Sequence, residues 1–313
     1  MIVDSILSEY DGQREAFLEL QRQVSDQISD ALKKDGIRVL SLSARVKDRA
    51  SLHGKILRKP GKYFSLSEIT DILGVRVIVF FADDIDRTGR VIEQTFNVDR
   101  ENSVDKRKSI AATEFGYLSL HYICSIKPEI NRELSPFKFE IQIRTGLQHI
   151  WAEIEHDIGY KSKFGIPRQI RRLFSKMASL LEIADDEFLV IRDGMDGFVS
   201  DMHKKIATGK TDAVHINSIS LAEYMAKSGK VKKLLEQIAN IDGAEISDIS
   251  PEVYVAQLDY LGKKTLADLD KMIDNLGPLA LQLAEKALKG LELDILSSNV
   301  ALLFLCRAEL VTD

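Results

Sequence analysis

The chain has 313 residues, of which 45% are hydrophobic and 29% are charged. This composition excludes disordered and fibrous proteins, and the length suffices for one large domain or two smaller ones. No apolar stretch approaches the roughly 20 residues of a spanning helix, and the acidic start is unlike a secretory signal. We therefore expect a cytoplasmic protein that binds no membrane. A net charge of −5 argues against a globally basic nucleic-acid binder.

The first two thirds of the chain mix helical and strand patterns. Apolar residues recur at helical spacing near the start, and β-branched and aromatic residues mark three stronger strands further on. Between the first and the second of these strands, a polar stretch is longer than an ordinary loop between secondary-structure elements. In chain order we predict a helix over 6–34, a short strand after Gly36, a strand over 75–81, a helix over 85–96, a polar loop over 98–114, strands over 118–126 and 137–145, and helices over 145–192 with a break near Gly165 and Pro167.

The last third has only helical patterns, with breaks predicted at Gly243, Pro251, Gly262 and Gly277-Pro278. Glycines around residue 195 weaken the helical period and predict a linker. The predicted fold class is α+β, with a mixed β-sheet flanked by helices and then a small all-helical domain. The predicted divisions are an N-terminal helix 1–34, an α/β domain 35–194, a linker 195–219 and a helical domain 220–313.

Alternation along two strands gathers polar side chains on one face. In FKFEIQIRT and GYLSLHY every second residue is polar, and the residues between them are apolar. For one strand alone, a solvent-facing edge is the ordinary interpretation. Two such strands side by side could instead line one cleft. The polar residues are Tyr117, Ser119 and His121 in one strand and Glu140, Gln142 and Arg144 in the other.

Carboxylates and basic residues suggest a phosphate and metal site. Asp71 lies just before the strand over 75–81, and with Glu140 it forms a carboxylate pair of the kind that holds magnesium beside substrate phosphates. The segment before them is basic and could surround a polyphosphate, although a basic helix start is the simpler alternative. Its candidates are Arg45, Lys47, Arg49, Ser51 and Lys55.

Other clusters carry weaker signals. His149, Glu153 and His156 could share a helix face, which is more often a polar surface than a zinc site. Lys106, Lys108 and the arginine between them add charge to the polar loop, either as a solvated run or as a mobile nucleotide contact. Only two cysteines occur, Cys124 and Cys306, and we expect both to be buried and reduced.

Several motifs follow one another in the first two thirds of the chain, namely RVKDRASLHGK, DILGVRV, FGYLSLHY, EIQIRT and WAEIEHDIGYK. In this order they strongly resemble the synthetase domain of the RelA/SpoT family of alarmone synthetases, over about residues 35 to 193. The resemblance implies a nucleotidyltransferase-like sheet and a magnesium-dependent enzyme. It implies transfer of the β,γ-pyrophosphate of ATP to the ribose 3′-hydroxyl of GDP or GTP.

The resemblance also implies roles for individual residues. The matched positions divide into an ATP subsite, a metal and catalytic pair, and an acceptor subsite, with the helix over 145–161 similar to that of single-domain synthetases. The implied ATP ligands are Arg45, Lys47, Ser51, Lys55 and Arg76; the metal and catalytic residues are Asp71 and Glu140; the acceptor residues are Tyr117, Ser119, His121, Gln142 and Arg144; Glu155 and His156 match the single-domain signature.

Two departures from the motifs of the family leave the identity of the pyrophosphate acceptor open. Phe115 stands where alarmone synthetases often carry Asn, and the loop before it is longer and lacks a usual Pro-Lys pair. Toxic relatives instead modify the tRNA 3′ end or adenine nucleotides, and Lys33 and Lys34 could guide an RNA, although two lysines also suit a helix C-terminus. A catalytically inactive scaffold is a third alternative.

The sequence gives two further expectations. The only His-Asp dipeptide is His156-Asp157, inside an assigned helix, so we predict no alarmone hydrolysis. For the C-terminal domain we expect a packing or oligomerisation role, with Thr265 capping a helix, and we expect the whole protein to be a homo-oligomer. A regulatory or toxin-neutralising module is the alternative.

Overall fold

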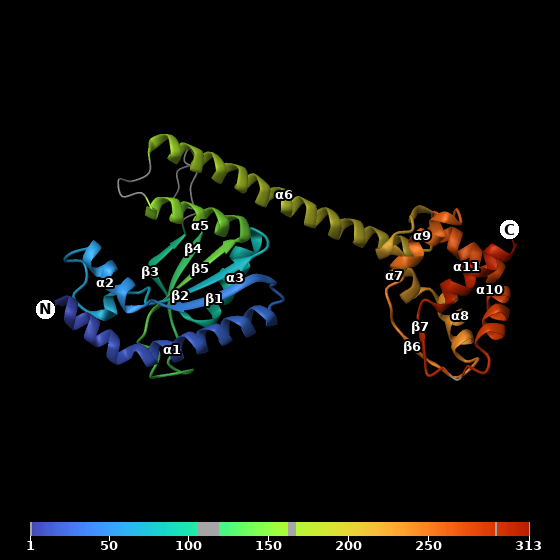
Figure 1. The fold of residues 1–313 in the computed structure, drawn as a ribbon, viewed down its shortest axis with the longest axis horizontal. Helices are drawn as coiled ribbons and strands as arrows, with labels where there is room; N and C mark the ends of the chain where they lie inside the picture. The colour runs from blue at the N-terminus through green and yellow to red at the C-terminus, as the bar shows by residue number, and fades with distance from the viewer. Residues whose placement is uncertain (1, 106–118, 162–166, 292, 313) are drawn as a thin grey trace. The chain divides into compact units, whose positions relative to one another are not determined.

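The computed structural model describes residues 2–105, 119–161, 167–291 and 293–312 (Figure 1). The chain divides into two compact units, residues 1–191 and 192–313, each with its own hydrophobic core. In the described part of the chain, none of the helices combines the length and the apolar character that crossing a membrane requires.

A five-stranded mixed sheet forms the centre of the first unit. The β2/β5 pair is parallel, and every other neighbouring pair is antiparallel. This arrangement confirms the predicted fold class of a mixed sheet flanked by helices. In spatial order the strands are β1 (Val39–Val46), β2 (Leu73–Val79), β5 (Phe139–Thr145), β4 (Leu120–Ser125) and β3 (Asn97–Asp105).

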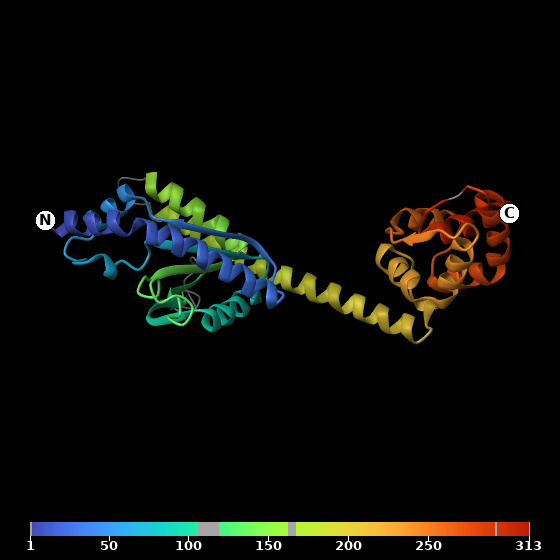
Figure 2. The same ribbon diagram turned by 90° about the horizontal axis from the view of Figure 1, so that it is seen from below.

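One face of the sheet packs on α1 (Ile2–Lys34) and α3 (Asp83–Thr95). Phe17 and Val24 on α1 are buried against the same core as Phe139 and Ile141 of β5. Each such side chain contributes roughly 1.5–3 kcal/mol when fully buried. Figure 2, the view from below, shows α1 in front of the sheet. Alternation along β5 therefore directs Glu140 and Gln142 to the opposite face.

The opposite face of the sheet is partly covered by α5 (Gly146–Lys161), which contacts β5 and β2 (Figure 1). Helix α6 (Arg168–Ala207) returns along α5. Trp151 of α5 packs edge-on against Phe174 of α6 with ring centroids 6.1 Å apart, and its indole N–H donates to the Phe174 carbonyl. Thr145 and Gln148 form the predicted capping interaction at the start of α5.

Two sequence predictions for the first 220 residues are wrong. Residues 98–105 belong to strand β3 and not to a polar loop, because β3 is an edge strand whose outward positions stay in water. The rest of that loop lies outside the described residues. The predicted linker begins inside α6, which continues to Ala207 despite Gly194 and Gly197. Met202 and Val199 anchor this end of the helix in the second core.

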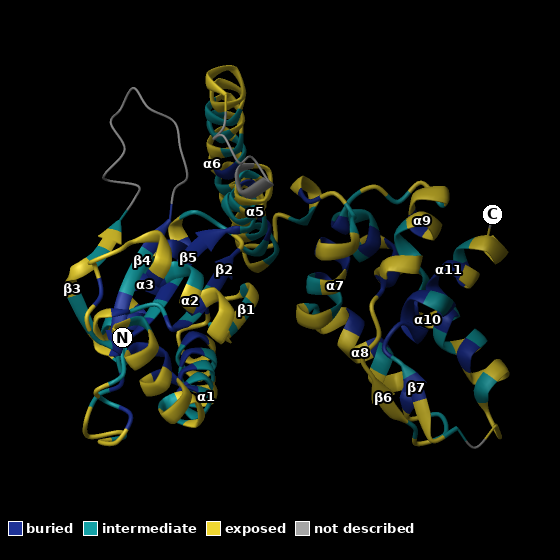
Figure 3. Ribbon diagram, turned by 60° about the vertical axis from the view of Figure 1, so that its left-hand side comes forward, coloured by how far each residue is buried: buried dark blue, intermediate teal, exposed yellow. Residues whose placement is uncertain are grey.

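The second unit is a helical bundle with one short parallel strand pair, which the prediction of an all-helical domain did not include. Its buried residues concentrate on α10 and α11 (Figure 3). The elements are α7 (Ser218–Lys227), α8 (Gly229–Ala239), β6 (Glu245–Ser247), α9 (Glu252–Tyr260), α10 (Leu266–Leu288), β7 (Ile295–Ser297) and α11 (Val300–Thr312). A 3-10 turn at Thr211–Ala213 also belongs to this unit, and the first unit has one at Leu66–Glu68.

Of two local signals that the sequence gives for α10, the N-terminal cap is present in the structure and the internal break is not. Thr265 caps it in a reciprocal capping box with Asp268, as predicted. The break predicted at Gly277-Pro278 is absent, because α10 continues through Pro278. An interior proline costs about 3 kcal/mol, and burial of the apolar face that includes Leu269 and Ala280 offsets this loss.

Candidate active site

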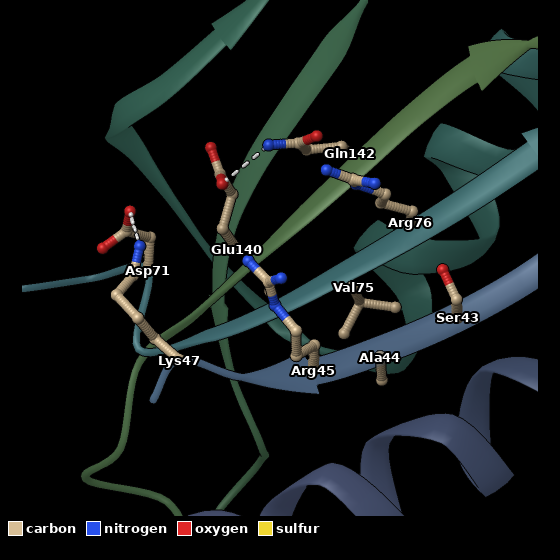
Figure 4. Close-up of a pocket in the computed structure, with 10 residues that line it drawn as sticks. Ser43, Ala44, Arg45, Lys47, Asp71, Val75, Arg76, Glu140 and Gln142 are labelled. Carbon is tan, nitrogen blue, oxygen red and sulfur yellow. Dashed lines mark hydrogen bonds and ion pairs between the residues drawn. The ribbon is translucent and has the colours of Figure 1, made fainter. Parts of the chain in front are cut away.

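A cavity of about 370 Å³ lies on the sheet face opposite α1 (Figure 4). Strands β1, β2 and β5 supply most of its lining, and Asp71 and Lys47 come from the segments that adjoin β2 and β1. The structure thus brings together most of the residues that the sequence assigned to ATP and metal binding. The lining residues are Ser43, Ala44, Arg45, Lys47, Asp71, Gly74, Val75, Arg76, Glu140 and Gln142.

Strand register explains why these side chains meet. Arg45 is paired with Gly74, which in turn lies beside Glu140, so the three form one row across the sheet. Gly74 has no side chain, and a Cβ built there would meet nothing within 4 Å. No side chain therefore fills the space between Arg45 and Glu140. Arg76 and Gln142 occupy the next row in the same way.

Two lysines hold the Asp71 carboxylate. Lys47 Nζ lies 3.1 Å from Asp71 Oδ2, and Lys55 Nζ, on α2 (Arg49–Arg58), lies 2.5 Å from Oδ1. Burial raises the pKa of Asp71, but the Lys55 hydrogen bond and the two positive charges outweigh it and hold the pKa below its ordinary value. Asp71 is therefore ionised at neutral pH. The Tyr10 hydroxyl donates to the Lys47 carbonyl at 2.6 Å and fixes this end of β1.

An imidazole and an amide hold the Glu140 carboxylate. Its Oε1 lies 2.9 Å from His121 Nδ1, and its Oε2 accepts a hydrogen bond from Gln142 Nε2 at 2.9 Å (Figure 4 shows the second). Arg144 donates in turn to Gln142 Oε1 at 2.9 Å. Burial raises the pKa of Glu140, yet the His121 interaction outweighs it, with a smaller contribution from Gln142, so the pKa lies below its ordinary value. The strand alternation predicted this row correctly.

Asp71 and Glu140 fit a divalent cation. Both line the cavity, and the Asp71 charge raises the pKa of Glu140, which means that the two carboxylates repel each other. A bound cation would relieve this repulsion. Magnesium uses one or two carboxylates and completes its coordination with water and substrate phosphates, and the lysines beside Asp71 would attract the same phosphates.

Glu153 is a site residue that the sequence reasoning assigned differently. It lies on α5, and its Oε1 is 3.0 Å from an amino group of Arg76, so α5 orients one of the guanidinium groups of the cavity. His149 Nδ1 is 3.8 Å from the same oxygen. The motif WAEIEHDIGYK contained the signal, but Glu153 was considered only as a zinc ligand. Glu155 and His156 of that motif do not line the cavity.

Some predicted site residues lie elsewhere. The Ser51 hydroxyl donates to Asp48 at 2.8 Å and so serves the N-terminus of α2. Ser119 is buried just before β4, and its hydroxyl has no hydrogen-bond partner among the described residues. Tyr117 and Phe115 lie outside the described residues, as do the loop lysines Lys106 and Lys108.

Part of the chain is similar to known proteins. Residues 44–164 match a family model described as a region found in RelA / SpoT proteins. The chain is 32% identical over 159 residues to the GTP pyrophosphokinase YwaC of Bacillus subtilis, a match that covers 49% of this chain and 73% of YwaC. The chain belongs to the RelA/SpoT family. It is therefore a pyrophosphokinase of the transferase class, and the matched region contains the whole cavity lining except Ser43.

The chain is also similar to another curated protein and to a solved structure. The GTP pyrophosphokinase YjbM of Bacillus subtilis is 31% identical over 194 residues, covering 58% of this chain and 90% of YjbM. Among solved structures, small alarmone synthetase 2 from Bacillus subtilis matches with a TM-score of 0.46 and 27% identity, over 60% of this chain and 96% of that structure.

Proposed function

We propose that this RelA/SpoT protein is a magnesium-dependent synthetase that transfers the β,γ-pyrophosphate of ATP to the ribose 3′-hydroxyl of GDP or GTP and so makes (p)ppGpp. The observation that carries the proposal is the cavity. Two carboxylates, Asp71 and Glu140, lie there with the cationic side chains of Arg45, Lys47 and Arg76. Pyrophosphoryl transfer needs positioning and charge neutralisation more than covalent catalysis, and this set of groups supplies both.

The donor side of the cavity is the Asp71 end. Lys47 and Lys55 converge on Asp71, so a polyphosphate placed there would meet two ammonium groups. Arg45 and Arg76 project from β1 and β2 and present guanidinium planes on which an adenine ring can stack. When bound at Asp71 and Glu140, magnesium would neutralise the charge that develops on the phosphate oxygens.

The acceptor side is the Glu140 end. In the proposed reaction the acceptor 3′-oxygen bonds to the β-phosphorus of ATP, the bond from that phosphorus to the α,β-bridging oxygen breaks, and AMP leaves. The 3′-hydroxyl proton passes to Glu140. A carboxylate that is ionised at neutral pH can accept this proton, and His121 and Gln142 hold its oxygens in place.

The test is an assay of the purified protein with γ-labelled ATP and magnesium, offering GDP, GTP, an adenine nucleotide and deacylated tRNA in parallel. We expect label on GDP and GTP, and none when magnesium is chelated. Label on tRNA alone or on the adenine nucleotide alone would overturn the proposed acceptor. Absence of label on every acceptor would overturn the proposal itself.

We further propose that the chain does not hydrolyse the alarmone. The support is that His156 and Asp157, the only His-Asp dipeptide, are exposed residues of α5 outside the cavity. Incubation of the protein with labelled (p)ppGpp and manganese or magnesium checks this point, and release of labelled pyrophosphate would contradict it.

A further inference from the structure

Strand β1 carries cavity residues on one side and core residues on the other. Arg45 and Lys47 line the cavity, whereas Leu42 and Val46 pack on the core below the sheet. Among the described residues, β1 lies at the edge of the sheet and pairs with β2 alone. An edge strand leaves one row of its N–H and C=O groups without a partner strand. The position of Arg45 and Lys47 therefore depends on what else holds β1.

Helix α1 holds β1 through two side-chain donors. The Tyr10 hydroxyl donates to the Lys47 carbonyl at 2.6 Å, and the Gln21 side-chain amide donates to the Ala44 carbonyl at 3.0 Å. These two carbonyls lie on either side of Arg45 in the chain. Both ends of the segment that bears Arg45 and Lys47 are therefore tied to α1.

The Tyr10 side chain is itself firmly held. It is 1% exposed, and its ring stacks on that of Phe17 with the ring centroids 6.4 Å apart. Phe17 in turn packs edge-on against Phe137, with centroids 5.0 Å apart. Side chains in such a close-packed core keep one rotamer on average. The Tyr10 hydroxyl is therefore a fixed point for the Lys47 backbone.

Lys47 connects this fixed point to the rest of the donor side of the cavity. Its N–H donates to the Ile72 carbonyl at 2.7 Å, and its ammonium lies 3.1 Å from Asp71 Oδ2 (Figure 4). The next residue, Asp48, caps α2, which carries Lys55. A shift of the Lys47 backbone would therefore disturb the Asp71 contact and the start of α2 together.

Other contacts of the same turn of α1 lie nearer the surface. The Glu9 carboxylate accepts from the Leu66 N–H at 3.3 Å, in the 3-10 turn that precedes Asp71. Asp11 pairs with Arg49 at 3.0 Å, but these two side chains are 47% and 58% exposed. Exposed ion pairs contribute little. The buried tyrosine is therefore the contact of this turn that can position the donor side most firmly.

We propose that Tyr10 is a positioning residue of the donor site, whose hydroxyl holds the Lys47 backbone where the Lys47 ammonium meets both Asp71 and the phosphates of ATP. The inference rests on the proposed placement of ATP at the Asp71 end of the cavity. Without the hydroxyl, the half-buried Lys47 carbonyl loses its partner and the segment shifts to find water. ATP must then restore the original position, so the loss appears as weaker binding of the donor.

Tyr10→Phe tests this role because it removes the hydroxyl and keeps the buried ring. The measurement is calorimetric titration of the full chain with magnesium and AMPCPP, an ATP analogue whose α,β-bridging oxygen is replaced by a methylene group, so that no pyrophosphate is transferred. We expect the Kd to rise by roughly 3- to 10-fold, the usual effect of one hydrogen bond. In rate assays the KM for ATP should rise by a similar factor, while kcat and the KM for the acceptor stay nearly unchanged.

Tyr122→Phe is the matched control. It removes a hydroxyl that donates to Glu93 of α3 at 2.7 Å, and neither residue lines the cavity. Both variants lose one tyrosine hydrogen bond, so we expect both to lower the melting temperature. Only Tyr10→Phe should weaken the binding of AMPCPP.

Two outcomes would overturn the inference. One is an unchanged Kd for AMPCPP in Tyr10→Phe, and the other is an equal rise of the Kd in Tyr122→Phe, which would reduce Tyr10 to a general contribution to stability. Neither outcome affects the proposed transfer reaction, which is judged by the labelling of acceptors by the unchanged chain. The titration needs no acceptor, so it tests Tyr10 whichever acceptor the enzyme uses.

Discussion

Asp71 and Glu140 line one cavity, yet the protein stabilises their charges by different means. Two ammonium groups, from Lys47 and Lys55, contact Asp71, whereas an imidazole and an amide contact Glu140. Burial opposes ionisation of both carboxyls, and in both cases the contacts outweigh it and lower the pKa. The lowered pKa is thus reached with two lysines at Asp71 and with a histidine and a glutamine at Glu140.

The difference bears on what each carboxylate can do. The lysines at Asp71 carry mobile cationic heads that an incoming phosphate can draw away, which would free the carboxylate for a cation. Of the partners of Glu140, His121 lies on the neighbouring strand β4 and Gln142 lies on β5 itself, and the two are paired across the sheet. We therefore expect Asp71 to act mainly in metal binding and Glu140 in proton transfer as well. Three substitutions test this contrast, and a fourth tests a buried carboxyl that has no such partners.

Glu140→Gln should have the largest effect. The amide keeps the shape of the side chain and can still accept from Gln142, but it cannot take a proton and carries no charge. We expect pyrophosphate transfer to fall by roughly 10²- to 10⁴-fold, the usual range for loss of a general base. Rates at saturating substrates measure this, with melting temperature as the control for folding. A rate close to that of the unchanged chain would remove Glu140 from the chemistry.

Asp71→Asn should come next, with a loss of roughly 10²- to 10³-fold. Without the carboxylate charge, Lys47 and Lys55 repel the cation that one remaining carboxylate must hold. Raising the magnesium concentration should restore part of the activity of this variant but none of the activity of Glu140→Gln. An equal response of the two variants to magnesium would mean that Asp71 and Glu140 do not differ in their roles.

His121→Asn should lower the rate by about 10- to 100-fold, as expected for a residue that orients a catalytic ligand. The hydrogen bond from His121 is the largest of the interactions that lower the pKa of Glu140. When this hydrogen bond is lost, burial raises the pKa of Glu140. Glu140 then stays protonated to a higher pH, and the acid limb of kcat/KM against pH should move upward. His203→Asn, on the distant end of α6, is the control. An unmoved acid limb would show that His121 does not act through Glu140.

Asp185→Asn should leave activity nearly unchanged and affect stability instead. Burial raises the pKa of Asp185 to about 6, because the hydrogen bond from the Thr145 hydroxyl lowers the pKa by less than burial raises it. The folded state therefore holds a proton that the unfolded chain has released above about pH 4, and stability falls as pH rises from about 4 to 6. Asparagine still accepts from Thr145 without this cost.

Calorimetric melts of both chains between pH 4 and pH 8 measure the Asp185 effect. The variant should be the more stable chain at neutral pH, and the difference should disappear towards pH 4. A difference that does not depend on pH would mean that Asp185 is ionised in the folded protein, like Asp71 and Glu140.

Local patterns in the sequence were enough to predict one row of the site. Alternation in FKFEIQIRT puts Glu140, Gln142 and Arg144 on one face whatever the partner strands are, and the structure has this row. The contacts of His121 and Asp71 could not be predicted from local patterns. They depend on strand register and on chain segments 16 to 24 residues apart, which only the folded sheet brings together.

The errors arose where tertiary packing overrides local signals. Polar residues in β3 suggested a loop because an edge strand has little to bury, and Gly194 and Gly197 suggested a linker because glycine weakens isolated helices. In the protein Met202 anchors the same helix in the second core.

The contact between Trp151 and Phe174 has a spectroscopic consequence. Trp151 is the only tryptophan of the chain, and it is buried between α5 and α6 of the first unit. Its fluorescence should therefore emit at short wavelength in the native protein and shift to the red when that unit opens. Because no other indole contributes, unfolding of the second unit alone should leave the emission unchanged, which makes the emission a record of the first unit alone.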